Sequence, residues 1–479
     1  MLGLVLGGAV NARLSQPDLK PWHRVRLDDI TASVADRQFT FEQYLAREDQ
    51  LFAQVRALES SIAAEDRTPV NRYYTGSLTN VSRADRDWNR SYETLPQGPL
   101  HGGALLLHGL TDSPYSMRAV AKVLAEHGIY SLAMRMPGHG TIPSGLVTAQ
   151  WEDWLAAVRV GARHVRSRIP SDAPFIVVGY SNGGALALKY TLETVEHQDD
   201  PVPAKVILLS PMIGVTPAAR LARWIGMLGF IPYFEKANWI DVVPEYNPFK
   251  YNSFAANAGF QTSRITRTIQ ADLDRAQTAG RLAKLPPIQT FQSIVDSTIS
   301  APAVFFSLYE RLPSNGSELV LFDVNHLSGI DVFVQASDQA IGQRFLTAAA
   351  RPYRRVLVTN VSAETRDAEA RVVEAGQTAV SHTSLGLAWP ADVYSLTHVA
   401  VPFTVDDPLY GIDAPPAPDG LLALGRLSPR GEKGVLTIGS DVLMRLSSNP
   451  FFPFVAERIG QWLDGAAPSP RITPTASPH

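Results

Sequence analysis

The chain has 479 residues, of which 45% are hydrophobic and 19% are charged, which is ordinary for a globular protein with a sizeable core. A formal net charge of −3, without a basic run, argues against nucleic acid or an anionic membrane as a partner. The sequence has no cysteine, which excludes disulfides, thiolate metal sites and a cysteine nucleophile but does not fix the compartment.

The N-terminus has two readings. Residues 2–10 form a short hydrophobic segment, and Val10, Asn11 and Ala12 resemble a cleavage site. The segment lacks a basic region and is too short to span a bilayer. It is either the remnant of a signal or anchor, which implies export or membrane attachment, or a frayed terminus of a cytoplasmic protein. No later stretch is long and apolar enough to be an integral membrane span.

A polar lead-in precedes the core. Apolar residues recur at helical spacing over residues 39–62, which predicts one or two helices packed on the core. A loop over residues 96–103 closes this part. We therefore expect residues 1–100 to form an N-terminal helical extension.

Residues 101–214 alternate between strand and helix patterns, as a parallel α/β sheet does. Strands are expected at 104–107, 130–136, 175–178 and 206–209, and an amphipathic helix is expected at 151–168. His108 and His139 follow the first two strands. We expect both to shape their loops rather than to do chemistry.

The centre of this region is the sequence GYSNG at residues 179–183. It joins the apolar strand to a helix of small and apolar residues. A strand that turns into a helix around G-x-S-x-G is the nucleophile elbow of α/β-hydrolases. Because larger side chains than glycine would clash in so tight a turn, the pattern predicts Ser181 as a nucleophile held at a helix N-terminus.

An acyl-transfer nucleophile needs two fixed donors for the oxyanion of the tetrahedral intermediate. The strand that ends in His108 and Gly109 stands where α/β-hydrolases put half of that site. We assign the two donors to the backbone N–H groups of Leu110 and Asn182.

The alternation breaks at residues 215–285, which are rich in Trp, Phe, Tyr and Met. An insertion here would lie over the carboxyl ends of the strands, where open α/β sheets bind ligands. We expect a helical cap whose aromatic residues accept an apolar acyl or alcohol group.

The second part of the core is expected in residues 286–479. A strand over 288–295 reaches Asp296, the position that a catalytic acid needs. The further expected elements are a helix at 301–312, strands at 319–322 and 355–358 followed by a polar stretch, a helix at 451–463 and a disordered Pro/Ser tail.

Three histidines follow Asp296: His326, His382 and His398. His326 follows the next strand, as in the simplest version of the fold. His398 is about a hundred residues beyond the acid but is flanked by a turn-rich stretch that suits a loop over the serine. Position along the chain leaves these two open and disfavours His382.

The motifs HGLTDSPYSMR, RMPGHGT, GYSNGGALALKY, FQSIVDSTI and SLTHVAVPF with DDPLYG together resemble a family of bacterial α/β-hydrolase-fold carboxylesterases with a long C-terminal insertion. The similarity runs from about residue 100 to the final helix. It implies that the histidine of the SLTH motif, His398, completes the triad, and it implies no metal or organic cofactor.

The expected fold is therefore an α/β-hydrolase with a mostly parallel central sheet, a helical cap and an N-terminal extension. The expected function is that of a serine carboxylic ester hydrolase that acts on a small-molecule ester through Ser181, His398 and Asp296. The alternatives are a mono- or diacylglycerol lipase and a non-catalytic ligand-binding protein on the same fold. The oligomeric state is left open.

Overall fold

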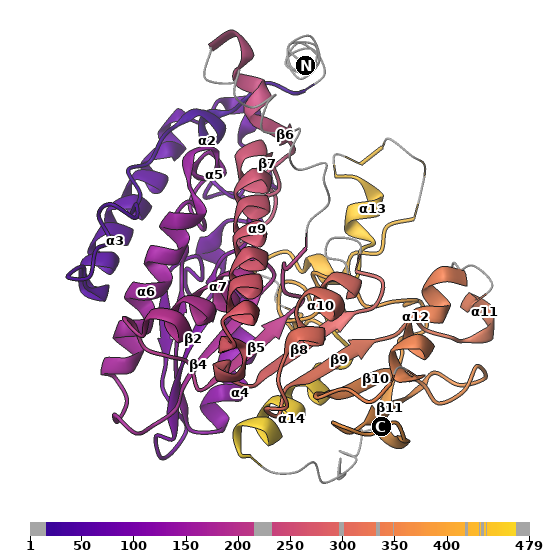
Figure 1. The fold of residues 1–479 in the computed structure, drawn as a ribbon. Helices are drawn as coiled ribbons and strands as arrows, with labels where there is room; N and C mark the ends of the chain where they lie inside the picture. The colour runs from indigo at the N-terminus through magenta and orange to yellow at the C-terminus, as the bar shows by residue number, and fades with distance from the viewer. Residues whose placement is uncertain are drawn as a thin grey trace.

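A computed structural model describes residues 16–214, 232–296, 301–331, 336–347, 349–416, 420–430, 432, 435–436 and 438–465. In this part of the chain a ten-stranded sheet has the order β1-β3-β2-β4-β5-β8-β9-β10-β11-β12 (Figure 1). The strands from β3 to β10 pair in parallel, while β1 and the hairpin β11–β12 pair antiparallel. This is the mostly parallel sheet that the sequence predicts.

The strands are β1 Tyr92–Thr94, β2 Gly102–Leu107, β3 Ile129–Met134, β4 Phe175–Tyr180, β5 Lys205–Leu209, β6 Trp239–Asp241, β7 Phe254–Ala255, β8 Ile288–Ser293, β9 Glu318–Phe322, β10 Arg354–Asn360, β11 Asp367–Val373 and β12 Val380–Ala388. The α-helices are α2 Pro21–Arg24, α3 Phe41–Ala57, α4 Arg118–Glu126, α5 Gly145–Thr148, α6 Trp151–Ser167, α7 Asn182–His197, α9 Ala256–Thr278, α10 Ala301–Ser307, α11 Ser328–Asp331, α12 Ala336–Thr347, α13 Ser440–Leu443 and α14 Phe452–Leu463. Short 3₁₀ helices lie at Leu58–Ser61, Ala64–Asp66, Val81–Arg83, Pro114–Met117, Pro232–Asn238, Arg281–Lys284, Tyr309–Arg311 and Leu424–Arg426.

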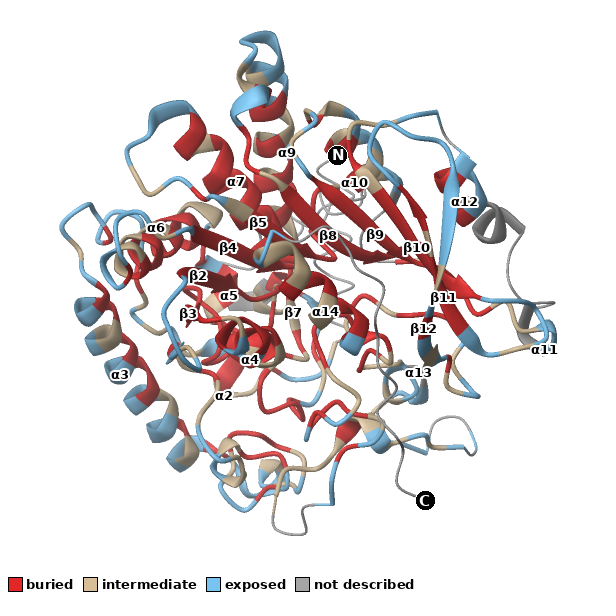
Figure 2. Ribbon diagram, turned by 90° about the horizontal axis from the view of Figure 1, so that it is seen from below, coloured by how far each residue is buried: buried red, intermediate tan, exposed pale blue. Residues whose placement is uncertain are grey.

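Helices cover both faces of the sheet. Alternate side chains of each strand point to opposite faces, so Leu105 and Leu107 pack with helices α6, α7 and α9, and Ala104 and Leu106 pack with α4 and α14. Figure 2 shows the central strands buried on both sides, while β12 at the far edge is largely exposed. The result is a three-layer α/β arrangement.

The N-terminal extension is tied to the core by a buried charge cluster. The Arg135 guanidinium, after β3, donates to Asp29 at 2.9 Å and to Glu48 of α3 at 3.1 Å. Arg135 is fully buried, and such a charge is tolerated inside a protein only when it is paired and hydrogen-bonded. Residues 16–57 therefore pack as part of the molecule's core rather than as a separate unit.

The segment predicted as a cap has two different parts among its described residues. Residues 232–255 lie at the carboxyl ends of the strands, since the Tyr251 N–H donates to Thr111 O, in the loop after β2, at 2.7 Å. Helix α9 instead flanks the sheet, against the prediction. It packs on α7, and its Asp272 pairs with Lys189 of that helix at 2.6 Å.

The C-terminal half also differs from the sequence expectation. The polar stretch expected after residue 358 contains the antiparallel hairpin β11–β12, which is not predicted from the sequence. The last helix is found as α14, while the hydrophobic segment 2–10 and the Pro/Ser tail lie outside the described residues. None of the described helices combines the length and the apolar character needed to cross a membrane.

Candidate active site

The turn between β4 and α7 holds Ser181 in an unusual backbone conformation, with φ 56° and ψ −116°. The neighbouring glycines make this turn possible. A Cβ on Gly179 would lie 2.3 Å from the Gly183 carbonyl oxygen, and one on Gly183 would lie 2.1 Å from that of Leu107. The clash predicted from the sequence is therefore present at both positions, and Ser181 stands at the tip of the turn.

Ser181, His398 and Asp296 come together in one hydrogen-bonded row. His398 Nε2 lies 3.0 Å from Ser181 Oγ, and His398 Nδ1 lies 2.8 Å from Asp296 Oδ2. All three residues are buried, with between 4% and 8% of their surface exposed. In this row Nδ1–H donates to the carboxylate, which leaves Nε2 free to accept the Ser181 hydroxyl proton.

The loop that carries His398 is held against the end of strand β9. Val324 and Ser395 form an antiparallel bridge, and the Asn325 N–H donates to Tyr394 O at 2.8 Å. The imidazole of His398 stacks on the ring of Tyr180, with a centroid distance of 5.5 Å. After the strands β10, β11 and β12, the chain thus returns to the active site, where His398 contacts Tyr180, the residue before Ser181.

The other two histidines have different partners. His326 Nε2 lies 3.1 Å from Asp323 Oδ2, on the loop after β9. His382 lies on β12, with Nδ1 at 3.2 Å from Glu369 of β11. The geometry brings His398, and neither of these, to Ser181.

The predicted oxyanion donors flank Ser181. Asn182 is the first residue of α7, where an amide has no partner within its helix. Gly109 places the other loop close by, since a Cβ on it would lie 3.2 Å from Ser181 Cβ. The Leu110 amide follows directly after Gly109.

His108 and His139 stabilise loops, as their sequence context suggests. His108 Nε2 accepts the Met136 N–H at 3.0 Å, and His139 Nδ1 donates to Pro137 O at 3.0 Å. Burial lowers the pKa of His139 to about 4, so this ring is neutral at physiological pH. Both ring nitrogens of His108 and the Nδ1 of His139 thus bind backbone groups.

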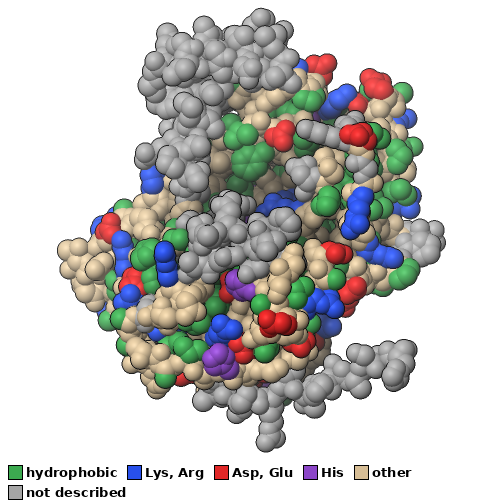
Figure 3. Space-filling view, turned by 90° about the vertical axis from the view of Figure 1, so that its right-hand side faces the viewer, with side chains coloured by type: hydrophobic (Ala, Val, Ile, Leu, Met, Phe, Trp, Pro, Cys, Tyr) green, Lys and Arg blue, Asp and Glu red, His purple; other side chains and the backbone are tan. Residues whose placement is uncertain are grey.

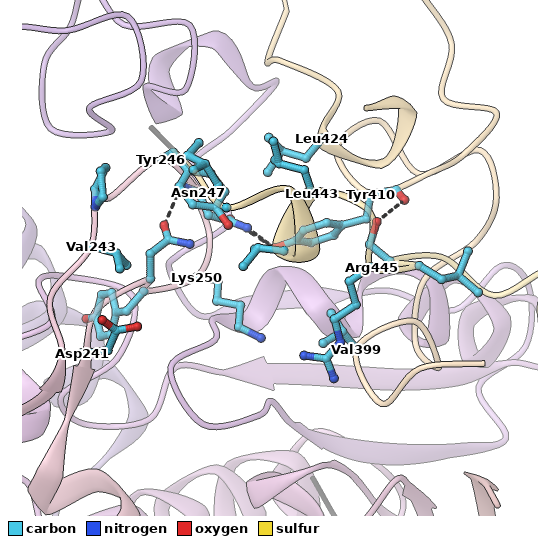
Figure 4. A pocket seen from close by; sticks show the side chains of 18 residues that line it. Asp241, Val243, Tyr246, Asn247, Lys250, Val399, Tyr410, Leu424, Leu443 and Arg445 are labelled. Carbon is cyan, nitrogen blue, oxygen red and sulfur yellow. Dashed lines mark hydrogen bonds between the residues drawn. The ribbon is translucent and has the colours of Figure 1, made fainter. Parts of the chain in front are cut away.

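A pocket of about 300 Å³ opens beside the His398 loop (Figure 4). Its walls come from residues 241–252 and 438–447, and Val399, next to His398, contributes to them. Sequence reasoning missed two of its lining residues, Lys250 and Arg445. The sequence does show Lys250 as a single lysine within an aromatic stretch, which could have marked it as a candidate binding residue. No sequence pattern connects Lys250 to Arg445.

Among the described residues, no group of three or more His, Asp and Glu side chains is arranged to hold a metal ion.

The part of the chain that is similar in sequence to known proteins lies mainly in the core. Residues 99–321 match the family described as serine aminopeptidase, S33. The chain is 30% identical to a thermostable monoacylglycerol lipase of Bacillus sp. (strain H-257), over 37% of this chain and 66% of the relative. It is 32% identical to a carboxylesterase of Bacillus subtilis (strain 168), over 22% of this chain and 41% of the relative.

The chain thus spans less than two thirds of the length of either curated relative. A solved structure from work on LipS and LipT, two metagenome-derived lipolytic enzymes, is 20% identical, covers 50% of this chain and 88% of its own, and has a TM-score of 0.39. The family match begins just before β2 and ends within β9, so it contains the elbow and most of the parallel sheet. The chain has the α/β-hydrolase fold, and its matched part is similar to the serine aminopeptidase family and to bacterial esterases and lipases.

Proposed function

We propose that the protein is a carboxylesterase that acts through a Ser181–His398–Asp296 triad and an acyl-enzyme intermediate. The observation that carries the proposal is the unbroken row of hydrogen bonds from Ser181 Oγ through the imidazole of His398 to Asp296. A serine hydroxyl is a weak nucleophile by itself, and an adjacent neutral imidazole is the group that activates it.

In the first half of the reaction, Ser181 Oγ attacks the ester carbonyl carbon while His398 Nε2 takes the hydroxyl proton. Asp296 accepts a hydrogen bond from Nδ1 and stabilises the imidazolium that forms. The N–H groups of Leu110 and Asn182 donate to the oxyanion. When the carbon–oxygen bond to the alcohol breaks, the imidazolium returns its proton to the leaving alkoxide.

In the second half, a water molecule replaces the alcohol. His398 takes a proton from that water as its oxygen attacks the acyl carbon of Ser181, and the imidazolium then protonates Ser181 Oγ. The carboxylic acid leaves and the free enzyme is restored.

A monoacylglycerol lipase is the second candidate. It is favoured by the 30% identity to the Bacillus monoacylglycerol lipase and by the aliphatic side chains in the pocket, among them Val243, Leu424 and Leu446. Hydrolysis of short p-nitrophenyl esters and of monoacylglycerols by the same preparation separates the two activities.

The proposal is tested by hydrolysis of p-nitrophenyl butyrate by the wild type and by Ser181→Ala, His398→Ala and His326→Ala. The first two variants should lose about 10³-fold or more in kcat, because the members of a triad act as a unit. His326→Ala is the matched control and should stay within about threefold of the wild type, since His326 pairs with Asp323.

A dead His326→Ala with an active His398→Ala would show that the triad closes through the other histidine. A wild type that does not exceed Ser181→Ala on p-nitrophenyl esters, on monoacylglycerols and on aminoacyl p-nitroanilides would overturn the enzymatic proposal. A serine-directed phosphonate that labels the wild type but not Ser181→Ala would separate an enzyme from a non-catalytic binding protein.

A further inference from the structure

The pocket beside the His398 loop has a mixed lining. Most of its wall is aliphatic or aromatic, but Lys250 comes from the segment between β6 and β7 and Arg445 follows α13. In Figure 4 the charged ends of these two side chains point toward the same part of the pocket. The face in Figure 3 is hollowed near its centre, with Lys or Arg atoms visible inside the hollow.

Neither cation forms an ion pair with a carboxylate of the described residues. Within the described part of the chain, neither the Lys250 ammonium nor the Arg445 guanidinium has a hydrogen-bond partner, and no carboxylate oxygen lies within 4.0 Å of either. Burial lowers the pKa of Lys250, Asp112 raises it and the nearby charge of Arg445 lowers it. A half-buried lysine beside a second cation gains from a bound anion that replaces the lost water.

The acidic groups near this pair do not cancel it. Asp112 is buried, its carboxylate accepts the Ser113 N–H at 3.1 Å, and burial raises its pKa to about 6, so at pH 7 it is mostly ionised and offsets part of the charge of Lys250. One carboxylate facing two cations leaves the pair with a net positive charge. Asp241 also lines the pocket but is exposed and, in Figure 4, lies on the side away from Arg445.

The two cations are near the reacting groups. Lys250 precedes Tyr251, whose N–H donates to Thr111 O in the loop of the predicted oxyanion donor Leu110. The Thr397 hydroxyl, next to His398, donates to the carbonyl oxygen of Leu446, which directly follows Arg445. Val399 and Arg445 line the same pocket, so Arg445 lies beside the loop that carries His398.

We propose that Lys250 and Arg445 form a subsite for a carboxylate on the ester substrate, so that the preferred substrates are esters with an acidic group in the acyl or alcohol part. The inference rests on the proposed ester hydrolysis and specifies its substrate class. The planar guanidinium matches a carboxylate with two parallel hydrogen bonds, while the lysine adds a point charge. The aliphatic wall takes the carbon chain between the carboxylate and the ester.

The test is binding to the Ser181→Ala protein, which holds the intact ester. The ligands are the mono-p-nitrophenyl esters of succinic, glutaric, adipic and suberic acid, each compared by calorimetry with a neutral p-nitrophenyl ester of equal length. At least one acidic ester should bind about tenfold or more tightly than its neutral counterpart, and added salt should reduce that preference.

In the same background, Lys250→Met and Arg445→Gln should each weaken binding of that acidic ester by about 10- to 100-fold and affect the neutral ester much less. Lys284→Met, at an exposed lysine of the 3₁₀ helix Arg281–Lys284, is the matched control and should change neither affinity. Thermal unfolding establishes that each variant is folded. The salt dependence of binding tests the subsite without either of these substitutions, so it does not depend on how well the variants fold.

Equal affinity for acidic and neutral esters across the series would overturn the subsite, as would equal losses for both ligands in the two variants or no binding of either. Hydrolysis by the wild-type protein tests the proposed function separately. If the wild type hydrolyses esters but acidic esters do not bind more tightly, only the subsite proposal is wrong. If acidic esters bind more tightly but no ester is hydrolysed, only the esterase proposal is wrong.

Discussion

Ser181 is held in a backbone conformation that side-chain-bearing residues rarely adopt, at a cost of about 1–3 kcal/mol. Hydrogen bonds from both sides keep it there: its N–H donates to Leu209 O at 2.9 Å, and its carbonyl accepts from Gly184 and Met212, also at 2.9 Å. Strand β5 and helix α7 therefore hold the turn, and the hydroxyl is kept facing His398 without any rearrangement.

Gly109 is the residue through which the predicted oxyanion loop approaches this serine. In Gly109→Ala, the new Cβ would lie 3.0 Å from the Tyr180 ring and 3.2 Å from Ser181 Cβ, so the loop must move. We expect kcat for p-nitrophenyl butyrate to fall by about 3- to 10-fold, because a displacement of about 1 Å at a reacting group costs about 100-fold and these contacts require a shift of only a few tenths of an ångström.

Gly259→Ala in helix α9 is the matched control. Its Cβ would meet the Phe254 ring at 3.5 Å, an ordinary contact, so activity should be unchanged and stability should rise by about 0.5–1 kcal/mol. A Gly109→Ala enzyme with wild-type kcat would show that the loop is not part of the oxyanion site.

Among the elements, helix α2 of the N-terminal extension is anchored through one histidine. His23 Nδ1 accepts the Lys20 N–H at 3.0 Å, Nε2 lies 3.0 Å from Ser253 Oγ, and the ring packs edge-on against Trp239 at 4.9 Å. This joins the start of the chain to the strands β6 and β7 at the mouth of the site.

That contact should depend on pH. Burial lowers the pKa of His23 to about 3 from an ordinary value of 6.5. Between these values the unfolded chain binds a proton that the folded chain excludes, so stabilisation present above pH 6.5 is lost as the pH falls. The advantage of the wild type over His23→Gln in free energy of unfolding should therefore shrink by about 1–3 kcal/mol between pH 7 and pH 4.

Urea unfolding of both proteins at a series of pH values measures this difference. His197→Gln, which changes an exposed histidine at the end of α7, should give a curve parallel to that of the wild type. Parallel curves for His23→Gln as well would mean that His23 has the same pKa in the folded protein as in the unfolded chain.

At the scale of the whole molecule, the second apolar cluster connects parts that are far apart in the sequence. Phe451, before α14, is fully buried; its ring stacks on Phe322 of β9 at 6.0 Å and meets the Trp389 ring edge-on at 4.8 Å. Trp389 and Leu396 belong to the segment that leads to His398. The end of the chain thus packs under the loop that completes the triad.

Phe451→Ala should lower the free energy of unfolding by about 3–5 kcal/mol, because it opens a cavity between three elements. Phe451→Leu should cost less than about 1.5 kcal/mol. Denaturant unfolding measures both, and heat inactivation of ester hydrolysis should follow the same order. A loss under about 1 kcal/mol for the alanine variant would show that the C-terminal segment is not integral to the fold.

The parts predicted best from the sequence are those with strong local signals. The elbow, the helix α6 and strands β2, β4 and β5 are continuous apolar or amphipathic runs. The hairpin β11–β12 was not predicted from the sequence because it forms the edge of the sheet. Only one residue of β12, Leu385, is buried. A strand that buries so little carries almost no apolar pattern to detect.

The sequence by itself determined the elbow at Ser181, with its glycines, because the turn depends on residues adjacent in the chain. It also placed Asp296 at the end of a core strand. The position of the residues could not choose between His326 and His398, because the distance between two side chains depends on how β10, β11 and β12 return the chain to β9. For the same reason, only the tertiary structure could bring Lys250 and Arg445, nearly two hundred residues apart, into one pocket.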